Sequence, residues 1–220
     1  MTSILSKRIH KILPQVITSV QSCAVSGANI CSSACNLLSF MEDVRRTGKN
    51  AAILSLDMFK AYNRVNLSYL EKVMAAMNFH KTFISWIILL HKGAKTKLLL
   101  DFMMEAISVL FSVRQGDPLA MLLYIFYIEP LLLRIQKVTS GFPLESPLVG
   151  GPASVSFEAT RELLEGFVDD VEVVIVSDSE LLKVDSVGRD FERISGAIIN
   201  RSKKSKIMGL GGWKGWESIG

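Results

Sequence analysis

Aspartates that end or interrupt apolar runs constrain the fold of this chain more than any other feature. Residues 51–56, Ala-Ala-Ile-Leu-Ser-Leu, form a short apolar run typical of a buried strand, and Asp57 follows it directly. Asp169 and Asp170 lie side by side within 163–176, a stretch that predicts two short strands around them. A single acid at a strand end is ordinarily a turn or cap residue, and an acid pair between strands is ordinarily a hairpin turn. Each acid group taken alone therefore has a structural explanation.

Taken together, these acids predict a metal site. Two strand-end carboxylates brought side by side in one sheet repel each other strongly unless a cation or a proton lies between them. Ligand sets made only of oxygen suit Mg²⁺, which keeps some of its waters and binds through a few carboxylates and substrate phosphates. Two such ions about 3.5–4 Å apart can activate an attacking hydroxyl and stabilise a leaving oxygen in phosphoryl transfer.

The remaining sequence predicts helices, a second strand pair and one long loop region. Apolar positions at helical spacing, with serine, glycine and proline boundaries, indicate helices at 4–19, 30–47, 69–77, 83–91, 118–138 and 177–194. We expect Pro14 to end or kink the first of these helices. Residues 96–100 and 106–113 predict a strand pair, and the prolines and glycines within 139–162 predict a loop.

Composition and charge exclude several classes of protein. Hydrophobic residues make up 49% and charged residues 21%, which supports a packed core and excludes wholesale disorder. The apolar run Leu119–Ile128 is about half of the roughly 20 residues that a membrane span needs, so we expect no membrane association.

The amino terminus lacks a secretory signal, and Cys23, Cys31 and Cys35 lie too close together for a disulfide framework, so we expect an intracellular protein with buried, reduced thiols. The net charge of +4 is compatible with a polyanionic partner without requiring one.

Five motifs in a fixed order give the chain a specific resemblance. Leu56–Val65 reads LDMFKAYNRV, and Val113–Leu119 reads VRQGDPL. The others are Phe167–Asp170 (FVDD), Ser195–Lys203 (SGAIINRSK) and, upstream, Gln21–Ala28 (QSCAVSGA). Together they resemble the reverse transcriptase domain of non-LTR (LINE-type) retrotransposons over almost the whole chain. The combination is specific, whereas any one motif alone would be weak.

This resemblance implies roles for the acids and for one aromatic residue. Asp57 and Asp169 would ligate two Mg²⁺ ions, or Mn²⁺ in their place, and Asp170 would be a further ligand or an orienting acid. The primer 3′-hydroxyl would attack the α-phosphate of a bound deoxynucleotide, and pyrophosphate would leave. Tyr62 resembles the aromatic gate whose ring collides with a ribose 2′-hydroxyl, and its alternative interpretation is a core aromatic.

The resemblance also implies contacts to nucleotide and template. Arg114 and Gln115 would contact the nucleotide or the template. Gly116 would let the backbone approach the base pair closely, because glycine has no side chain to obstruct it. Lys203 would assist the departure of pyrophosphate, and its alternative interpretation is an ordinary surface lysine.

The implied fold is α+β: a right-hand polymerase palm in which helices back a small antiparallel sheet that carries the acids. We expect partial helical fingers at 1–50 and the palm at 51–207, with a fingers-like excursion at about 78–113. Residues 208–220 would be the start of a thumb-proximal segment, with the thumb itself absent. The implied partners are an RNA template, a DNA primer, dNTPs and the remainder of a larger retrotransposon polyprotein, in a nuclear or cytoplasmic ribonucleoprotein.

Two departures from the family's pattern leave alternatives open. Ala28 stands where the pattern has an arginine that faces template or triphosphate, and Asn63 stands where it has an acid outside the metal site. Ala28 and the missing thumb favour the first alternative, a catalytically inactive or co-opted remnant that only binds nucleic acid. The second is a nucleotide cyclase or another two-metal phosphotransferase on a similar sheet, which the RQGDPL motif and Tyr62 disfavour.

Overall fold

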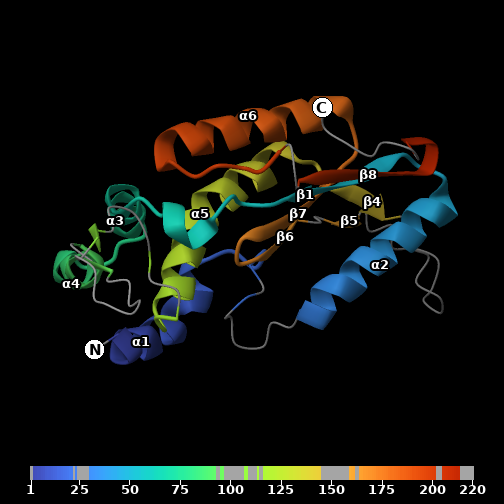
Figure 1. Cartoon of the computed structure of the whole chain (residues 1–220). Coiled ribbons are helices and arrows are strands. Elements are labelled where there is room, and N and C mark those ends of the chain that lie inside the picture. Colours follow the sequence, from blue (N-terminus) through green and yellow to red (C-terminus); the bar gives the residue numbers. More distant parts are fainter. Residues whose placement is uncertain are drawn as a thin grey trace, which may run out of the picture.

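A four-stranded antiparallel sheet with helices on both faces forms the centre of the structure, so the expected α+β class is confirmed (Figure 1). The structure is a computed structural model. It describes residues 2–21, 23, 30–92, 95–96, 107–108, 113, 116–144, 159–161, 164–201 and 205–213. In the sheet the strands follow the order β6-β7-β1-β8. Their bounds are β1 Ala51–Leu56, β6 Leu164–Phe167, β7 Asp170–Ile175 and β8 Lys206–Leu210.

The central strand β1 is apolar on both of its faces because each face meets a different core. Ala52 and Leu54 belong to the larger hydrophobic core, whereas Ala51 and Ile53 belong to a smaller one on the opposite face. Successive side chains of a strand point to opposite faces, so this alternation requires a run that is apolar throughout. The prediction that residues 51–56 form a buried strand is therefore confirmed.

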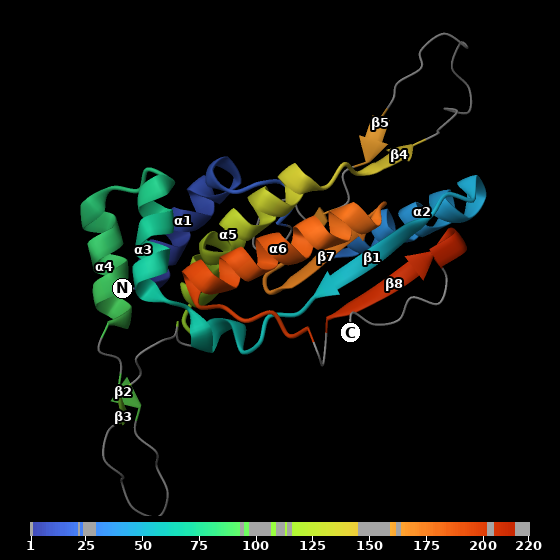
Figure 2. The same ribbon diagram turned by 90° about the horizontal axis from the view of Figure 1, so that it is seen from above.

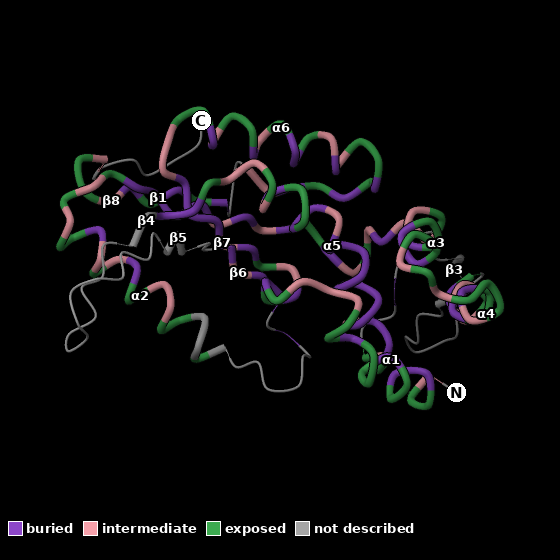
Figure 3. Tube along the Cα trace, turned by 180° about the vertical axis from the view of Figure 1, so that it is seen from behind, coloured by how far each residue is buried: buried purple, intermediate pink, exposed green. Residues whose placement is uncertain are grey.

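Helices α5 (Ala120–Val138) and α6 (Asp178–Ser195) cover the larger core, and α2 (Ile30–Thr47) covers the smaller one. Helix α5 is buried around most of its circumference, as the purple tube in Figure 3 shows. A helix that is apolar on nearly all sides belongs in a protein interior. On the other face, Phe40 of α2 packs edge-on against Phe142, with ring centroids 5.1 Å apart.

The remaining helices surround one end of α5. Helix α1 (Thr2–Val16) and helix α3 (Leu67–Ala76) contact α5, and α4 (Lys81–His91) packs on α3. A short 3₁₀ helix, η1 (Ala61–Arg64), follows the turn after β1. Helix α1 continues past Pro14 and ends at Val16. None of the helices in the described part of the chain has the length and apolarity that crossing a bilayer requires.

Two small strand pairs lie at opposite ends of the molecule in Figure 2. Strand β2 (Lys95–Thr96) pairs with β3 (Ile107–Ser108). Strand β2 overlaps the first expected strand at Thr96 and β3 lies within the second, and most other residues of the expected pair lie outside the described part. Strand β4 (Phe142–Leu144) pairs with β5 (Ala159–Arg161), within the region expected to be a loop. Strand β4 forms despite its proline and the neighbouring glycine because Phe142 packs in the core beneath α2.

Strand β8 was not predicted from the sequence. It pairs with the central strand β1, and Lys206 lies opposite Ser55. Glycine is depleted in strands, so the glycines of this segment do not predict a strand. Gly209 is needed here because a Cβ would collide with the backbone carbonyl of Trp213, where the 3₁₀ helix η2 (Gly211–Trp213) folds back over the strand. The expected division into fingers, palm and a thumb-proximal segment stays a prediction.

The cysteines also differ in part from the expectation. None of the three forms a disulfide, and Cys23 is buried as predicted. Cys31 and Cys35 are exposed, so the prediction of buried thiols is wrong for them. Both lie in the first turns of α2, before Phe40, whose side chain packs in the core beneath the sheet.

Candidate active site

The aspartates predicted from the sequence come together at one end of the sheet. Strands β1 and β7 run antiparallel with Leu56 opposite Val171. Asp57 therefore leaves β1 at the level where Asp170 begins β7. Acids from two distant parts of the chain are thus neighbours because of the strand register alone.

The hairpin between β6 and β7 places Asp169 beside these two acids. Phe167 pairs with Asp170, so the connecting loop consists of Val168 and Asp169. Val168 has a φ of 61° and is only 7% exposed. β-Branched residues rarely adopt positive φ, and such strain persists only where the surrounding structure holds it. Asp169 is half-buried and Asp170 is exposed, so both lie within reach of solvent at the turn.

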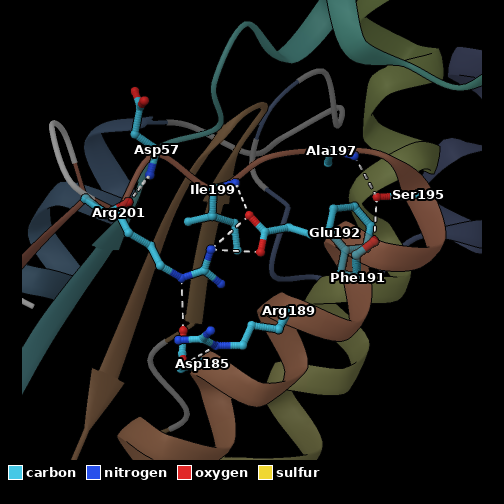
Figure 4. Close-up of polar contacts among 10 residues, drawn as sticks. Asp57, Asp185, Arg189, Phe191, Glu192, Ser195, Ala197, Ile199 and Arg201 are labelled. Atoms are coloured by element: carbon cyan, nitrogen blue, oxygen red, sulfur yellow. Dashed lines mark hydrogen bonds and ion pairs between the residues drawn. The ribbon is translucent and has the colours of Figure 1, made fainter.

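The loop between α6 and β8 holds Asp57 from its other side. The Asn200 backbone N–H donates to the Asp57 carbonyl oxygen at 2.8 Å, and Asn200 Nδ2 donates to Asp57 Oδ2 at 3.1 Å. The Asp57 backbone N–H donates in turn to Ser205 Oγ at 3.2 Å. Figure 4 shows the Asp57 side chain projecting away from the polar contacts made by Arg201. The orientation of Asp57 is therefore fixed by residues that follow helix α6.

Arg201 attaches the same loop to helix α6. Its Nε donates to Asp185 Oδ1 at 2.9 Å, and its Nη1 donates to Glu192 Oε2 at 2.7 Å (Figure 4). Glu192 Oε1 also accepts a hydrogen bond from the backbone N–H of Ile199 at 2.6 Å. Burial opposes ionisation of Asp185, but hydrogen bonds from Arg189 and Arg201 and their positive charges outweigh it and lower its pKa. The ion pairs thus fix the loop that orients Asp57.

Tyr62 lies beside the hairpin, on a second tyrosine. Its ring packs against Tyr124 of α5 with centroids 5.2 Å apart. Burial raises the pKa of Tyr62, and the negative charge of Asp169 raises it further, with a smaller contribution from Cys23. Burial is also the largest cause of the raised pKa of Tyr124, followed by the charge of Asp169. Both aromatic rings therefore lie within electrostatic reach of the hairpin acid.

The second motif begins next to Tyr62. The Val113 backbone N–H donates to the Tyr62 carbonyl oxygen at 3.1 Å. Gly116 is exposed with a φ of 87°, a conformation that glycine adopts without steric cost. The predicted contacts Arg114, Gln115 and Lys203, like the departure at Ala28, lie outside the described residues. The structure therefore brings Asp57, Tyr62 and the hairpin acids together, with the start of the second motif alongside.

The donor chemistry at this end of the sheet fits Mg²⁺. Asp57, Asp169 and Asp170 offer only carboxylate oxygens, the ligand type that this hard cation prefers. Among the described residues, no group of three or more histidine, cysteine, aspartate or glutamate side chains is arranged to hold a metal ion by itself. Mg²⁺ usually binds through one or two carboxylates together with waters and substrate phosphates, so an open set of acids is compatible with it.

The residues that hold Asp57 were not predicted from the sequence. Asn200 and Arg201 lie in the SGAIINRSK motif, and Ser205 lies just beyond it. Their position in the chain could have indicated this role, because the motif directly precedes β8, and β8 pairs with β1, the strand that ends just before Asp57.

Comparison with known proteins connects nearly all of the chain to one family. The sequence pattern described as "Reverse transcriptase (RNA-dependent DNA polymerase)" matches residues 1–214. A curated relative, the transposon TX1 uncharacterized 149 kDa protein of Xenopus laevis, is 29% identical over 205 residues. The matched region covers 93% of this chain and 15% of that protein, so the chain spans only a small part of its relative's length.

Solved structures share the fold at low sequence identity. Telomerase from Candida tropicalis, in complex with the TWJ fragment of telomeric RNA, gives a TM-score of 0.63 at 14% identity, over 98% of this chain and 34% of that one. Apo telomerase from the same organism gives 0.58 at 16% identity, over 96% of this chain and 36% of that one. Likeness at this identity shows the fold alone.

Proposed function

The chain belongs to the reverse transcriptase (RNA-dependent DNA polymerase) family, and from this premise we propose that it extends a DNA primer by copying an RNA template. The observation that carries the proposal is the meeting of Asp57 with the Asp169–Asp170 hairpin at one end of the sheet. An acid set at such a position suits nucleotidyl transfer, in which most of the catalysis is positioning and electrostatic stabilisation. The transposon relative supports an origin in a mobile element.

Asp57 and Asp169 are the proposed Mg²⁺ ligands, Mn²⁺ being a substitute, and Asp170 is the further ligand or orienting acid. When bound, the metal would supply positive charge that activates the primer hydroxyl and offsets charge on the phosphate oxygens. Asn200 would keep the Asp57 carboxylate in one orientation through its hydrogen bond to Oδ2. Ser205 would fix the backbone of the same residue. In this proposal the protein contributes to catalysis by holding the metal-binding carboxylates in fixed positions.

Tyr62 is the proposed gate against ribonucleotides. Its half-buried ring rests on Tyr124, which would stop it from moving away when a 2′-hydroxyl approaches. Arg114, Gln115 and Gly116 are proposed to contact the incoming nucleotide or the template, and Lys203 to assist pyrophosphate departure. The partners in this proposal are an RNA template, a DNA primer, dNTPs and a larger retrotransposon protein, in an intracellular ribonucleoprotein.

Primer extension tests the proposal directly. The chain is incubated with Mg²⁺, dNTPs and a labelled DNA primer annealed to RNA, beside a reaction that lacks the template. We expect stepwise extension only with the template. RNA binding without extension would contradict the proposal and would favour the binding-only remnant.

A further inference from the structure

We infer that Gln21 is a positioning residue that sets the conformation of the hairpin carrying Asp169 and Asp170. The inference rests on the proposed function, because it gives those two aspartates their role at the metal. Gln21 begins the upstream motif QSCAVSGA, for which the sequence predicts no role at this residue. The structure turns its side chain inward, since Gln21 is only 1% exposed. It therefore acts on the protein itself rather than on template or primer.

The contact is a hydrogen bond to the strained residue of the turn. Gln21 Oε1 accepts from the Val168 backbone N–H at 3.0 Å, across 147 residues of sequence. The same oxygen accepts from the Cys23 backbone N–H at 3.4 Å. Because Val168 holds a φ of 61°, its N–H points out of the regular strand pairing and needs a partner from elsewhere. Gln21 is that partner.

The backbone beside Gln21 is anchored to the same hairpin. The Gly166 backbone N–H donates to the Val20 carbonyl oxygen at 2.9 Å, and Gln21 forms a parallel bridge with Gly166. The glutamine thus approaches Val168 from a fixed position along β6. A side chain that is attached to one strand of a hairpin and bonded to its turn limits the conformations that the turn can adopt.

Two further features indicate that the hydrogen bond, and not simple packing, accounts for a glutamine here. A Cβ on Gly166 would lie 3.3 Å from Gln21 Nε2, so the glycine leaves room for the amide. Gln21 Nε2 is buried and has no hydrogen-bond partner among the described residues. Burying an unpaired donor is unfavourable, so leucine or methionine would serve better if the position only filled space. If the Gln21 amide were turned around, its NH₂ group would face the Val168 N–H, and two donors cannot form a hydrogen bond.

The test compares Gln21→Met, Gln21→Glu and the control Gln15→Met. Gln21→Met keeps the length of the side chain and removes the acceptor, whereas Gln21→Glu keeps an oxygen at the same reach. Gln15 is exposed on α1, so Gln15→Met makes the same chemical change away from the hairpin. Thermal melting of each variant checks that it is folded. If Gln21→Met does not fold, Gln21→Glu tests the inference alone: it keeps the acceptor, so Val168 exchange must stay near that of wild type, and faster exchange would overturn the inference.

Two measurements do not require activity. Amide hydrogen exchange reports the Val168 N–H, and broadening by Mn²⁺ of the Asp169 and Asp170 amide signals reports metal binding. In Gln21→Met we expect Val168 exchange to rise at least about tenfold and the Mn²⁺ concentration for half-broadening to rise about 10–100-fold, the usual cost of losing a group that orients a metal ligand. Gln15→Met should stay within a few-fold of wild type in both measurements, and Gln21→Glu should do so in Val168 exchange.

Primer extension then separates this inference from the proposed function. We expect Gln21→Met to lower kcat and raise the Mg²⁺ requirement while leaving the KM for the primed template near that of wild type. Unchanged Val168 exchange, or faster exchange with unchanged Mn²⁺ binding, would overturn the inference. Gln21→Met could differ from wild type in Val168 exchange and Mn²⁺ binding while the wild-type chain never extends a primer. That result would overturn the proposed function and leave the positioning role of Gln21 in place.

Discussion

Asn200 holds Asp57 at two points: its backbone N–H donates to the Asp57 carbonyl oxygen at 2.8 Å, and its side-chain Nδ2 donates to Asp57 Oδ2 at 3.1 Å. The backbone contact fixes where Asp57 lies, and the side-chain contact fixes how its carboxylate is turned. A carboxylate held in this way loses little conformational freedom when it binds a cation. The relationship therefore leads to a test of positioning at the proposed metal site.

Asn200→Ala should weaken metal-dependent activity more than stability. The backbone contact remains, but the carboxylate of Asp57 is free to rotate, so we expect the Mg²⁺ concentration for half-maximal extension to rise about tenfold or more. The matched control is Asn66→Ala, which removes the side-chain cap of α3 and should cost about 1 kcal/mol of stability. An equal Mg²⁺ requirement in both variants would contradict the role of Asn200.

Tyr62→Ala should change sugar selection. Removing the ring opens the space that a ribose 2′-hydroxyl would occupy, so we expect the preference for dNTP over rNTP in kcat/KM to fall on the order of tenfold or more, about 1.4 kcal/mol. Tyr62→Phe keeps the ring that packs on Tyr124 and is the control. Unchanged discrimination in Tyr62→Ala would assign the residue to the core instead.

Arg201→Met should destabilise the protein through the ion pairs that attach the Asn200 loop to α6. The Arg201 side chain is 27% exposed and bonds both Asp185 and Glu192, so we expect a loss of about 1–3 kcal/mol in the free energy of unfolding. The control is Arg193→Met, whose side chain is 77% exposed in its pair with Asp190 and should cost about 0–1 kcal/mol. Urea denaturation measures both, and similar losses would refute the structural role of Arg201.

Glu129→Gln should alter the pH dependence of stability. Burial raises the pKa of Glu129 above 4.5, although hydrogen bonding to Thr18 lowers it in part. The folded state therefore holds this proton more tightly than the unfolded chain, and the resulting stabilisation is lost as pH rises through the raised pKa. The glutamine does not titrate, so the variant should gain stability relative to wild type as the pH rises above the ordinary pKa of 4.5 and through the raised pKa.

Urea unfolding at several pH values checks the Glu129 prediction. Glu71→Gln, at an exposed position of α3, controls for the change in net charge. Parallel stability curves for wild type and Glu129→Gln would show that this carboxyl does not contribute to the pH dependence.

The central strands and the acids could be predicted because their signals are local. An apolar run that ends in Asp57 and a pair of short strands around Asp169 are visible in the sequence itself, and the register brings them together. The motif order then identified the family that matches residues 1–214. The long helix α5 was also recognisable, because a long apolar segment after Pro118 has little alternative to burial.

The contacts that hold the acids could not be predicted, because they join residues far apart in sequence. Asn200 reaches Asp57 across 143 residues, and Gln21 reaches Val168 across 147. No periodicity encodes such pairs. Strand β8 was missed for a different reason: Gly209 lowers strand propensity, and the need for glycine arises only from the folded-back backbone of Trp213.

The most direct test of the central claim is extension of a DNA primer on an RNA template with Mg²⁺, comparing wild type with Asp169→Asn and Asp178→Asn. The two substitutions make the same chemical change, one at the hairpin and one at the first turn of α6, beyond the far end of β7. The account predicts extension by wild type and Asp178→Asn, none by Asp169→Asn, and similar RNA binding by all three. Extension by Asp169→Asn at the wild-type rate would contradict it.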